Sequence, residues 1–502
     1  MADGEKDSKF NIGPFTGGLN QLEDSRLIGD DQLAICQNFD IGRAGELFVR
    51  PGLRRPVVFA NNQRLLGTVL LGNNTSRAFT RDVNFTGALY FTDGINITTA
   101  SNWSLISSGY VIGLAEKIVQ YNNSAWFIPK DVQFGTSTAA QGYRFTLDTN
   151  TGSTIAAMPR GTSAVVFKDR LFIFGPIDIN NTASQRVYYS AATDFTSFPA
   201  SNFFDINSGD GEGVTAAAVI ADTLVFFKRH STYALFFDSD PGLGTLRKVN
   251  AQIGATGPES VVGFENALYI IDERTVYKIQ NLLFTDIGRN LNLKNKRTTV
   301  VFGGTANRDS VTNFGPRLIF VVFTGAATPY SYYVYNTEIE AWSEYTFSEQ
   351  PERFYKVVNS TSFEDQIGGK SSSPNLYAIS PFRTDDAAFG DYPGTATSVT
   401  LQTKRYGNGP SSSYKRLFWW GLEVMTTANA TVTMRAISTN IGNSLDAVII
   451  GNGGFRFFKA FNSMRFRYVE FFLTSSALRI VVQSGLANCS SNHTGVSAAS
   501  NV

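Results

Sequence analysis

The chain has 502 residues, a formal net charge of +1 and two cysteines, Cys36 and Cys489. Its near-neutral charge argues against a polyanion-binding surface, because nucleic-acid-binding domains usually carry a basic excess on one face. Two cysteines at opposite ends of the chain are too few for a disulfide scaffold, so we expect free thiols in a protein made inside a cell. Aromatic residues make up 13% of the chain, and its Phe, Tyr, Val, Ile and Thr content predicts an all-β protein with very little helix.

The N-terminal segment, residues 1–60, is rich in turn chemistry and contains no catalytic pattern. Its polar first residues lack the apolar run of a signal peptide, and no run of about 18 apolar residues predicts a membrane span. Gly17 and Gly18 can adopt positive φ without a steric penalty, and Asn38 and Asp40 can bend the chain through hydrogen bonds to the backbone. We predict a clamping arm that enters a β-domain and either reaches a neighbouring ring or seals the first repeat of that domain.

Two local elements are expected within this arm. Residues 30–37 are a weak helical candidate, with the two aspartates at their start near a helix N-terminus. Residues 47–49 form a short strand with Leu47 and Val49 on one face, and Pro51–Gly52 ends that strand.

Residues 61–385 repeat one small pattern. An apolar stretch is followed by a short turn containing Asp or Asn and then by a strand that ends in aromatic residues, which predicts a hairpin. A marker leucine follows the turn at intervals of 53, 44 and 50 residues: Leu171, Leu224, Leu268 and Leu318. This spacing suits the period of roughly 40–50 residues typical of four-stranded propeller blades. We predict a β-propeller of six or seven blade-like units, because a single blade cannot cover both of its faces.

One unit illustrates the expected hairpin geometry. Residues 168–170 form its turn, which places Val165 and Phe167 opposite Leu171 and Ile173 on the partner strand.

The composition changes after about residue 350. Residues 354–379 are expected to form the last blade, followed by a polar linker. Residues 386–487 then form a second β-rich region, in which clean alternation over 430–437 and 466–473 predicts a small antiparallel β-sandwich. The small polar residues of 488–502 predict a loose tail.

The sequence offers few residues for catalysis or metal binding. Its only histidines are His230 and His493, so a multi-histidine metal site is excluded and a Ser-His-Asp triad would depend on a turn residue. Residues 205–214 carry several oxygen-bearing side chains without the spacing of a calcium loop, which favours a solvated turn between blades. Neither a phosphate-binding loop nor a repeated Asp box of the sialidase kind occurs. We expect no catalytic residue, no cofactor and no metal site.

Two clusters combine aromatic and basic residues, at 415–420 and 465–468. A nucleic-acid site would stack aromatic rings on bases and place Arg465 and Arg467 on phosphates. Strand alternation instead puts these two arginines on one face and Phe466 on the other. A structural strand whose polar face meets a neighbouring subunit is the preferred interpretation.

Several stretches, taken in order, resemble one family of virion proteins. They are Gly17–Asn20 (GGLN), Asn38, Gly45–Gly52 (GELFVRPG), Gly209–Leu235, residues 261–279 (VVGFENALYIIDERTVYKI) and Leu478–Ser484 (LRIVVQS). Similar stretches occur in this order in the nozzle, or tail hub, proteins of short-tailed, podovirus-like double-stranded DNA phages. The likeness covers most of the chain.

The resemblance implies a structural protein of the virion. In this family, propeller-containing subunits form a hexameric ring below the adaptor of the head-to-tail connector. Tail fibres and a central needle or plug attach to the ring, and DNA leaves through its lumen without sequence recognition. The implied location is the phage tail, after synthesis in the cytoplasm of the bacterial host. The expected structural or interface residues are Gly17, Gly18, Asn20, Asn38, Arg50, Pro51, Gly52, Arg465 and Arg467.

Two other functions stay open. A propeller hydrolase that processes glycans would hold two carboxylates about 5 to 9.5 Å apart in a central pocket. A lectin-like receptor-binding tail protein would expose Trp and Tyr side chains in a shallow site.

Overall fold

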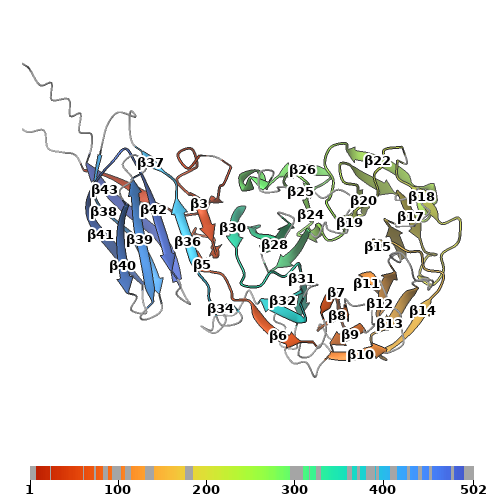
Figure 1. Cartoon of the computed structure of the whole chain (residues 1–502). Coiled ribbons are helices and arrows are strands. Elements are labelled where there is room, and N and C mark those ends of the chain that lie inside the picture. The colour runs from red at the N-terminus through yellow and green to blue at the C-terminus, as the bar shows by residue number, and fades with distance from the viewer. Residues whose placement is uncertain are drawn as a thin grey trace, which may run out of the picture.

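The computed structural model describes residues 7–22, 24–59, 62–72, 75–82, 89–92, 103–107, 115–129, 141–175, 185–207, 209–293, 309–315, 317–323, 330–358, 364–369, 373–379, 390–391, 395–407, 415–426, 430–438, 444–450, 455–475 and 480–490. Strands dominate these residues, so the all-β prediction is confirmed. Six four-stranded sheets and one end of an eleven-stranded sheet form a ring, and a two-sheet sandwich stands beside it (Figure 1). In this described part, no helix is long and apolar enough to cross a membrane.

The ring is a β-propeller of seven blades, each with four antiparallel strands. Blades 1 to 3 comprise β7 (Gln63–Leu70), β8 (Ser76–Asp82), β9 (Leu89–Thr92) and β10 (Trp103–Ser107); β11 (Ala115–Tyr121), β12 (Ser124–Pro129), β13 (Gly142–Thr146) and β14 (Thr151–Ile155); and β15 (Ser163–Phe167), β16 (Arg170–Phe174), β17 (Arg186–Tyr189) and β18 (Phe203–Asp205). Blades 4 and 5 comprise β19 (Ala216–Ile220), β20 (Thr223–Phe227), β21 (Thr232–Phe236) and β22 (Thr245–Asn250); and β23 (Val261–Phe264), β24 (Ala267–Ile271), β25 (Val276–Gln280) and β26 (Leu283–Asp286). Blades 6 and 7 comprise β27 (Ser310–Phe314), β28 (Arg317–Phe323), β29 (Tyr330–Asn336) and β30 (Ala341–Tyr345); and β31 (Arg353–Val358), β32 (Glu364–Gly369), β33 (Asn375–Ile379) and β6 (Arg54–Val58). The described residues also include the 3-10 helices η2 (Pro241–Leu243), between β21 and β22, and η3 (Arg289–Leu291), after β26.

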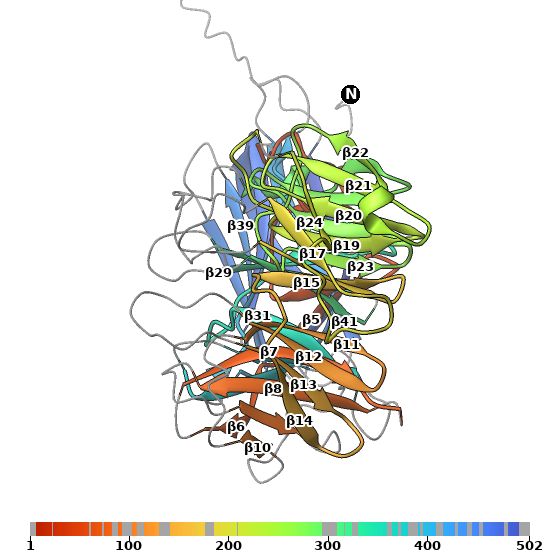
Figure 2. The same cartoon turned by 90° about the vertical axis from the view of Figure 1, so that its right-hand side faces the viewer.

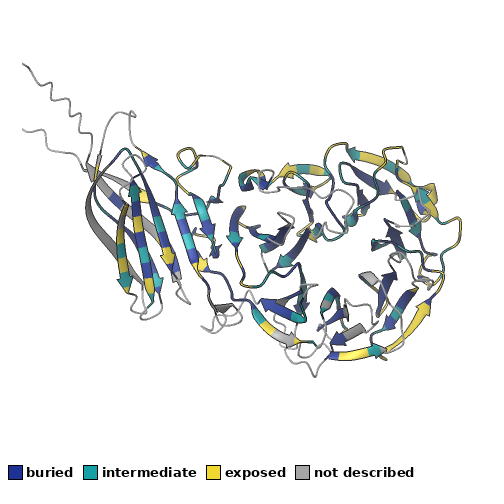
Figure 3. Cartoon of the chain, in the orientation of Figure 1, coloured by how far each residue is buried: buried dark blue, intermediate teal, exposed yellow. Residues whose placement is uncertain are grey.

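Neighbouring blades pack against each other through apolar side chains around the ring. The ring is seen face-on in Figure 1 and from its side in Figure 2. The first strand of each blade contacts the first strand of the next, from β7 round to β31 and back to β7. Six of the seven spaces between blades hold a separate buried cluster, for example Phe79 and Phe127 between blades 1 and 2. Between blades 5 and 6 the buried cluster is continuous with the core of the sandwich. Inner strands are mostly buried and outer strands such as β14 are exposed (Figure 3). Each blade therefore depends on both neighbours for its stability.

The propeller is closed by a strand from the N-terminal arm. β6 pairs antiparallel with β33, so blade 7 combines strands from both ends of the propeller sequence. The expectation that the arm seals the first blade is wrong, because it completes the last one. It also means that residues 54–58, assigned to the arm by sequence, belong to the propeller sheet.

The hairpin turns confirm the chemistry of the repeat but correct its register. Lys168 and Asp169 both have positive φ, as do Glu265 and Asn266 in blade 5, which is the geometry of two-residue hairpin turns. Arg170 already belongs to β16 and pairs with Phe167. The predicted three-residue turn is therefore wrong by one residue, and Val165 lies opposite Phe172 rather than Ile173.

The C-terminal region is a sandwich of two sheets that also contain most of the arm. One sheet contains β1 (Asp7–Ile12), β4 (Phe39–Ile41), β5 (Leu47–Val49), β38 (Lys415–Thr426), β41 (Phe455–Phe466) and β43 (Ile480–Ser490). The other contains β2 (Gly18–Leu19), β3 (Gln32–Gln37), β36 (Val399–Thr403), β37 (Tyr406–Gly407), β39 (Thr431–Ser438), β40 (Ser444–Ile450) and β42 (Tyr468–Ser475), and β34 (Gly390–Asp391) with β35 (Thr395–Ala396) forms a separate hairpin. The two sheets share a core in which Trp420 packs on Phe471 with ring centroids 4.6 Å apart.

The prediction that a loose tail begins at residue 488 is wrong, because the last strand of the sandwich extends beyond that residue. β43 continues to Ser490 and pairs with β1 along residues 7–12. Backbone pairing with the N-terminal strand outweighs the turn-like composition of this stretch. Residues 491–502 lie outside the described residues.

One sheet passes from blade 6 into the sandwich through the arm. β30 pairs with β3 at Gln37 and Glu344, and β3 pairs along its length with β36. The helix expected at 30–37 is therefore wrong. Leu33 and Cys36 of β3 are completely buried between the two partner strands, so sheet formation overrides the weak helical propensity.

Candidate functional site

The residues that the sequence singled out in the arm gather at the joint between propeller and sandwich. Gly18 has φ of 61° and lies against blade 6, where an added Cβ would sit 2.8 Å from the backbone oxygen of Trp342. The Gly17 amide donates to the Asp31 carbonyl, and the Gly18 amide donates to the Phe15 carbonyl. Gly18 therefore allows the arm to turn tightly on the surface of blade 6. Gly17 does not have positive φ, but an added Cβ there would lie 2.6 Å from Gln32 Cγ.

Replacing Gly18 with alanine is expected to lower the free energy of unfolding by about 1–3 kcal/mol, the cost of holding a non-glycine residue at this φ, before any clash with Trp342 is added. Gly72→Ala is the matched control, because its added Cβ would have no neighbour within 4 Å. Denaturant midpoints of the two variants check the difference. Equal midpoints for Gly18→Ala and the wild type would show that the arm does not need this turn.

Asn38 joins three parts of the chain through a single side chain. Its φ is 63°, which leaves the amide pointing inward. The Nδ2 group donates to Thr346 Oγ1 at 2.7 Å and to the Ser398 carbonyl at 2.6 Å. The Oδ1 atom accepts from the Thr346 amide at 2.7 Å and from Arg50 Nε at 2.9 Å. The arm, the end of blade 6 and the start of the sandwich are thus tied together at one residue.

Arg50 is a buried cation, with 1% of its surface exposed. Its guanidinium donates to the carbonyls of Pro51 and Thr346 and lies 4.3 Å from the ring centroid of Phe347. Burying a charge requires such partners, because its lost hydration is otherwise uncompensated. Arg50 therefore stabilises the contact between the arm and the end of blade 6 from inside the protein and is not a surface contact.

A second buried group lies on the other side of the same joint. Asp40 accepts a hydrogen bond from the Tyr345 hydroxyl and lies 2.9 Å from Arg317 Nη1. Burial, reinforced by the Asp40 charge, raises the pKa of Tyr345 well above its usual value, so the phenol stays protonated and acts as a donor. Asn336 Nδ2 adds a bond of 2.9 Å to the Ile41 carbonyl. Blade 6 and the arm are joined by charges and hydrogen bonds as well as by apolar packing.

The remaining predicted residues are divided between this joint and the sandwich. Asn20 is buried and donates from Nδ2 to Gln32 Oε1 at 2.9 Å. Pro51 and Gly52 are buried beside Arg50. Arg465 pairs in register with Arg416, and Arg467 lies between β41 and β42. The two arginines therefore lie at the β41–β42 end of the sandwich rather than on blade 6, where Gly18 lies.

The interior of the propeller holds an ion pair between blades that are not neighbours. Lys117 Nζ on β11 of blade 2 lies 2.9 and 3.0 Å from the two carboxylate oxygens of Glu259, which directly precedes β23 of blade 5. Arg353 Nη1 on β31 of blade 7 lies 3.9 Å from the same carboxylate. All three residues lie where the inner strands begin, so the pair crosses one mouth of the central channel.

The charges around Glu259 set its protonation state. Burial alone would raise its pKa, but Lys117, Arg353 and Arg64 together hold the pKa below the usual 4.5. A carboxylate that acts as a general acid needs the opposite shift. Glu259 therefore suits a permanent ion pair better than glycoside chemistry.

The loop 205–214 and His230 form a cluster of ion pairs at the face of blades 4 and 5. Lys228 Nζ, fully buried, lies 2.6 and 2.8 Å from the two oxygens of Asp210. The ring of His230 lies between Glu212 and Glu273, with Nε2 3.2 Å from Glu273. His230, which the sequence placed in a turn, is thus partly buried and paired with two carboxylates. Lys228 engages Asp210 and His230 engages Glu212, and among the described residues no group of three or more candidate ligands could hold a metal.

Replacing Asp210 with asparagine is expected to destabilise the protein by roughly 3–5 kcal/mol, because the buried Lys228 ammonium would lose its counter-charge. The thermal midpoint should fall in the variant, and that of the wild type should not respond to Ca²⁺ or EDTA. A rise of the wild-type midpoint with Ca²⁺ would instead assign the loop to a metal.

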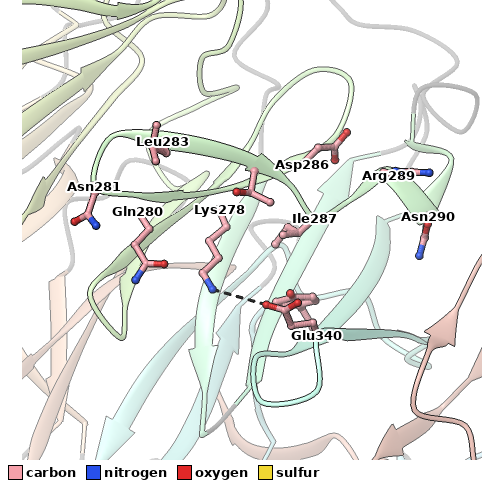
Figure 4. Close-up of a pocket in the computed structure, with 11 residues that line it drawn as sticks. Lys278, Gln280, Asn281, Leu283, Asp286, Ile287, Arg289, Asn290 and Glu340 are labelled. Atoms are coloured by element: carbon pink, nitrogen blue, oxygen red, sulfur yellow. Dashed lines mark ion pairs between the residues drawn. The ribbon is translucent and has the colours of Figure 1, made fainter.

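A polar pocket of about 440 Å³ lies at the rim, between blade 5 and the β29–β30 turn of blade 6 (Figure 4). Lys278 and Glu340 face each other across it, 4.0 Å apart. The carbonyl of Asn290 on its wall accepts from the amide of Gln21, so the arm supports the pocket from behind. No sequence motif marked this pocket, because its residues come from two separate blades.

Searches for known proteins give no family assignment. No family model matches the chain, and no curated protein matches it. Solved structures to which it is similar include an exo-β-1,3-galactanase from Phanerochaete chrysosporium (11% identity, TM-score 0.24, 74% of this chain and 94% of that chain). They also include the Pan2 WD40 domain from Neurospora crassa (9% identity, TM-score 0.43, 69% and 98%) and the β-propeller domain of the Trilobed protease from Pyrococcus furiosus (9% identity, TM-score 0.33, 65% and 99%). These similarities are too distant to carry an argument about substrate or partner.

Proposed function

We propose that the chain is a structural subunit of the ring-shaped nozzle at the end of a short phage tail. In this proposal the subunit lies below the adaptor of the connector, carries fibres and a needle or plug, and forms part of the conduit through which DNA leaves the virion. The proposal rests on the resemblance of the ordered sequence stretches. The location in the virion tail is part of the same proposal.

The observation that best supports this function is the position of the residues that carry the resemblance. The GGLN turn, Asn38 and Arg50 lie in three separate stretches, yet all contact the end of blade 6 at the joint with the sandwich. Their contacts are with backbone and buried side chains. Residues that hold the propeller and the sandwich together through buried contacts suit a structural subunit of an assembly.

In this proposal, the ion pair in the propeller argues against a DNA path along the axis of one subunit. The pair of Lys117 and Glu259 crosses the mouth of the central channel of a single subunit. DNA would therefore pass through the lumen enclosed by several copies and not along the axis of one propeller. Each subunit would act as one wall of that lumen.

Two observations on the described residues favour the nozzle over the alternatives. Glu259 is held as an ionised partner of Lys117, which does not suit a glycosidase acid. All five tryptophans are described, and each is buried or half-buried, whereas a lectin-like site needs exposed rings.

The mass of the purified full-length chain in solution tests the proposal. We expect a complex with six times the mass of one chain and no release of sugar from a panel of polysaccharides that includes β-1,3-galactan. A monomer that cleaves any of these polysaccharides would replace the nozzle by the hydrolase. A monomer without activity would also contradict the ring.

A further inference from the structure

Two open strand edges carry unusually exposed apolar side chains. Among the strands that the structure describes, the three most exposed large apolar residues are Leu283 on β26 (73%) and Ile450 and Val448 on β40 (69% and 66%). β26 pairs with β25 and β40 pairs with β39, and neither has a second partner among the described strands. Proteins normally protect such edges with charges, bulges or prolines, because an open edge pairs with other chains.

The edge of β26 borders the rim pocket. Leu283 and Thr285 line it from β26, and Lys278 and Gln280 line it from the neighbouring strand β25 (Figure 4). In the two-residue hairpin that joins these strands, Leu283 pairs with Gln280, so the backbone groups of Phe284 and Asp286 point outward. The pocket therefore combines a free backbone edge with space for the side chains of an added strand.

The edge of β40 has the complementary form. Asp446, Val448 and Ile450 alternate along the strand and are all exposed on one side. The two edges lie in different domains, β26 at the propeller rim and β40 at the far end of the sandwich (Figure 1). A ring of identical subunits needs such a pair of unlike surfaces, because one surface of each subunit contacts a different surface of the next subunit.

We propose that β40 of one copy adds to β26 of the next copy. This inference rests on the proposed ring and names the interface that closes it. An antiparallel register with Ile450 beside Leu283 puts Val448 beside Thr285, so the two most exposed apolar side chains cover each other.

Cross-linking of the full-length chain tests this register. In a Cys489→Ser background, Leu283→Cys combined with Ile450→Cys is expected to give a disulfide-linked ladder up to the closed ring under mild oxidation. Each single variant should give none. Leu105→Cys with Ile450→Cys is the matched control, because Leu105 is an exposed residue on the open outer strand of blade 1. A ladder from the control pair, or none from the Leu283 pair, would overturn the proposed interface.

A charge variant separates this inference from the ring itself. Val448→Asp with Ile450→Asp changes two exposed residues, so the thermal midpoint of the monomer should stay unchanged while the dissociation constant of the ring rises tenfold or more. A ring that forms normally in this variant overturns the β40–β26 contact and leaves the nozzle standing. A wild-type chain that never assembles overturns both.

Discussion

Replacing Arg50 with alanine is expected to lower the free energy of unfolding by roughly 3–5 kcal/mol, because buried acceptors lose their donor at about 1–3 kcal/mol each. The variant removes the donors to the carbonyls of Pro51 and Thr346 and to Asn38 Oδ1, together with the contact on Phe347. Equilibrium denaturation with a fluorescence probe measures the loss. Because the joint connects both domains, the sandwich and propeller should no longer unfold together in the variant.

Arg43→Ala provides the matched control for this prediction. Arg43 lies in the same arm and pairs with Glu338, but its side chain is 80% exposed. Exposed ion pairs contribute about 0–1 kcal/mol. If the two variants lost the same stability, or if Arg50→Ala unfolded like the wild type, Arg50 would not be the residue that stabilises the joint.

Replacing Glu259 with glutamine is expected to cost roughly 3–5 kcal/mol, because Lys117 and Arg353 would keep their charges in a buried site without a counter-charge. The loss should appear as a lower denaturant midpoint. Glu338→Gln is the matched control, since that carboxylate pairs with the exposed Arg43 and the variant should have a denaturant midpoint close to that of the wild type.

The pH dependence of this effect has a definite sign. The folded pKa of Glu259 lies below its usual 4.5, so its stabilisation is fully present above pH 4.5 and is lost as the pH falls through the folded pKa. The stability difference between the wild type and Glu259→Gln should therefore shrink on acidification. A difference that stays constant from pH 6 down to the acid unfolding transition would show that the carboxylate charge is not its source.

Local turn chemistry made much of the propeller predictable from the sequence. Asx and glycine turns recur at the spacing of blades, and the alternation of Leu47 and Val49 in the arm matches their burial on β5. The one-residue error at Arg170 arose because the polar residues 168–170 are compatible with both a two-residue turn and a three-residue turn. Register depends on which turn forms, and that choice is settled by the neighbouring blades.

Long-range pairing could not be predicted in the same way. β3 has weak helical propensity and becomes a strand only because β30 and β36 flank it. Lys117 and Glu259 are 142 residues apart and belong to no motif, so nothing in the local sequence indicates that they meet. Gly18 and Asn38 could be identified because positive φ restricts residue type, whereas the residues of the channel pair could not.

The most direct test of the account is electron microscopy of the purified full-length chain, alone and bound to the adaptor. The account predicts closed sixfold rings in which several copies enclose one lumen and the mouth of each propeller is crossed at Glu259. Dispersed monomers in both samples, or an assembly whose lumen runs along the axis of a single propeller, would contradict it.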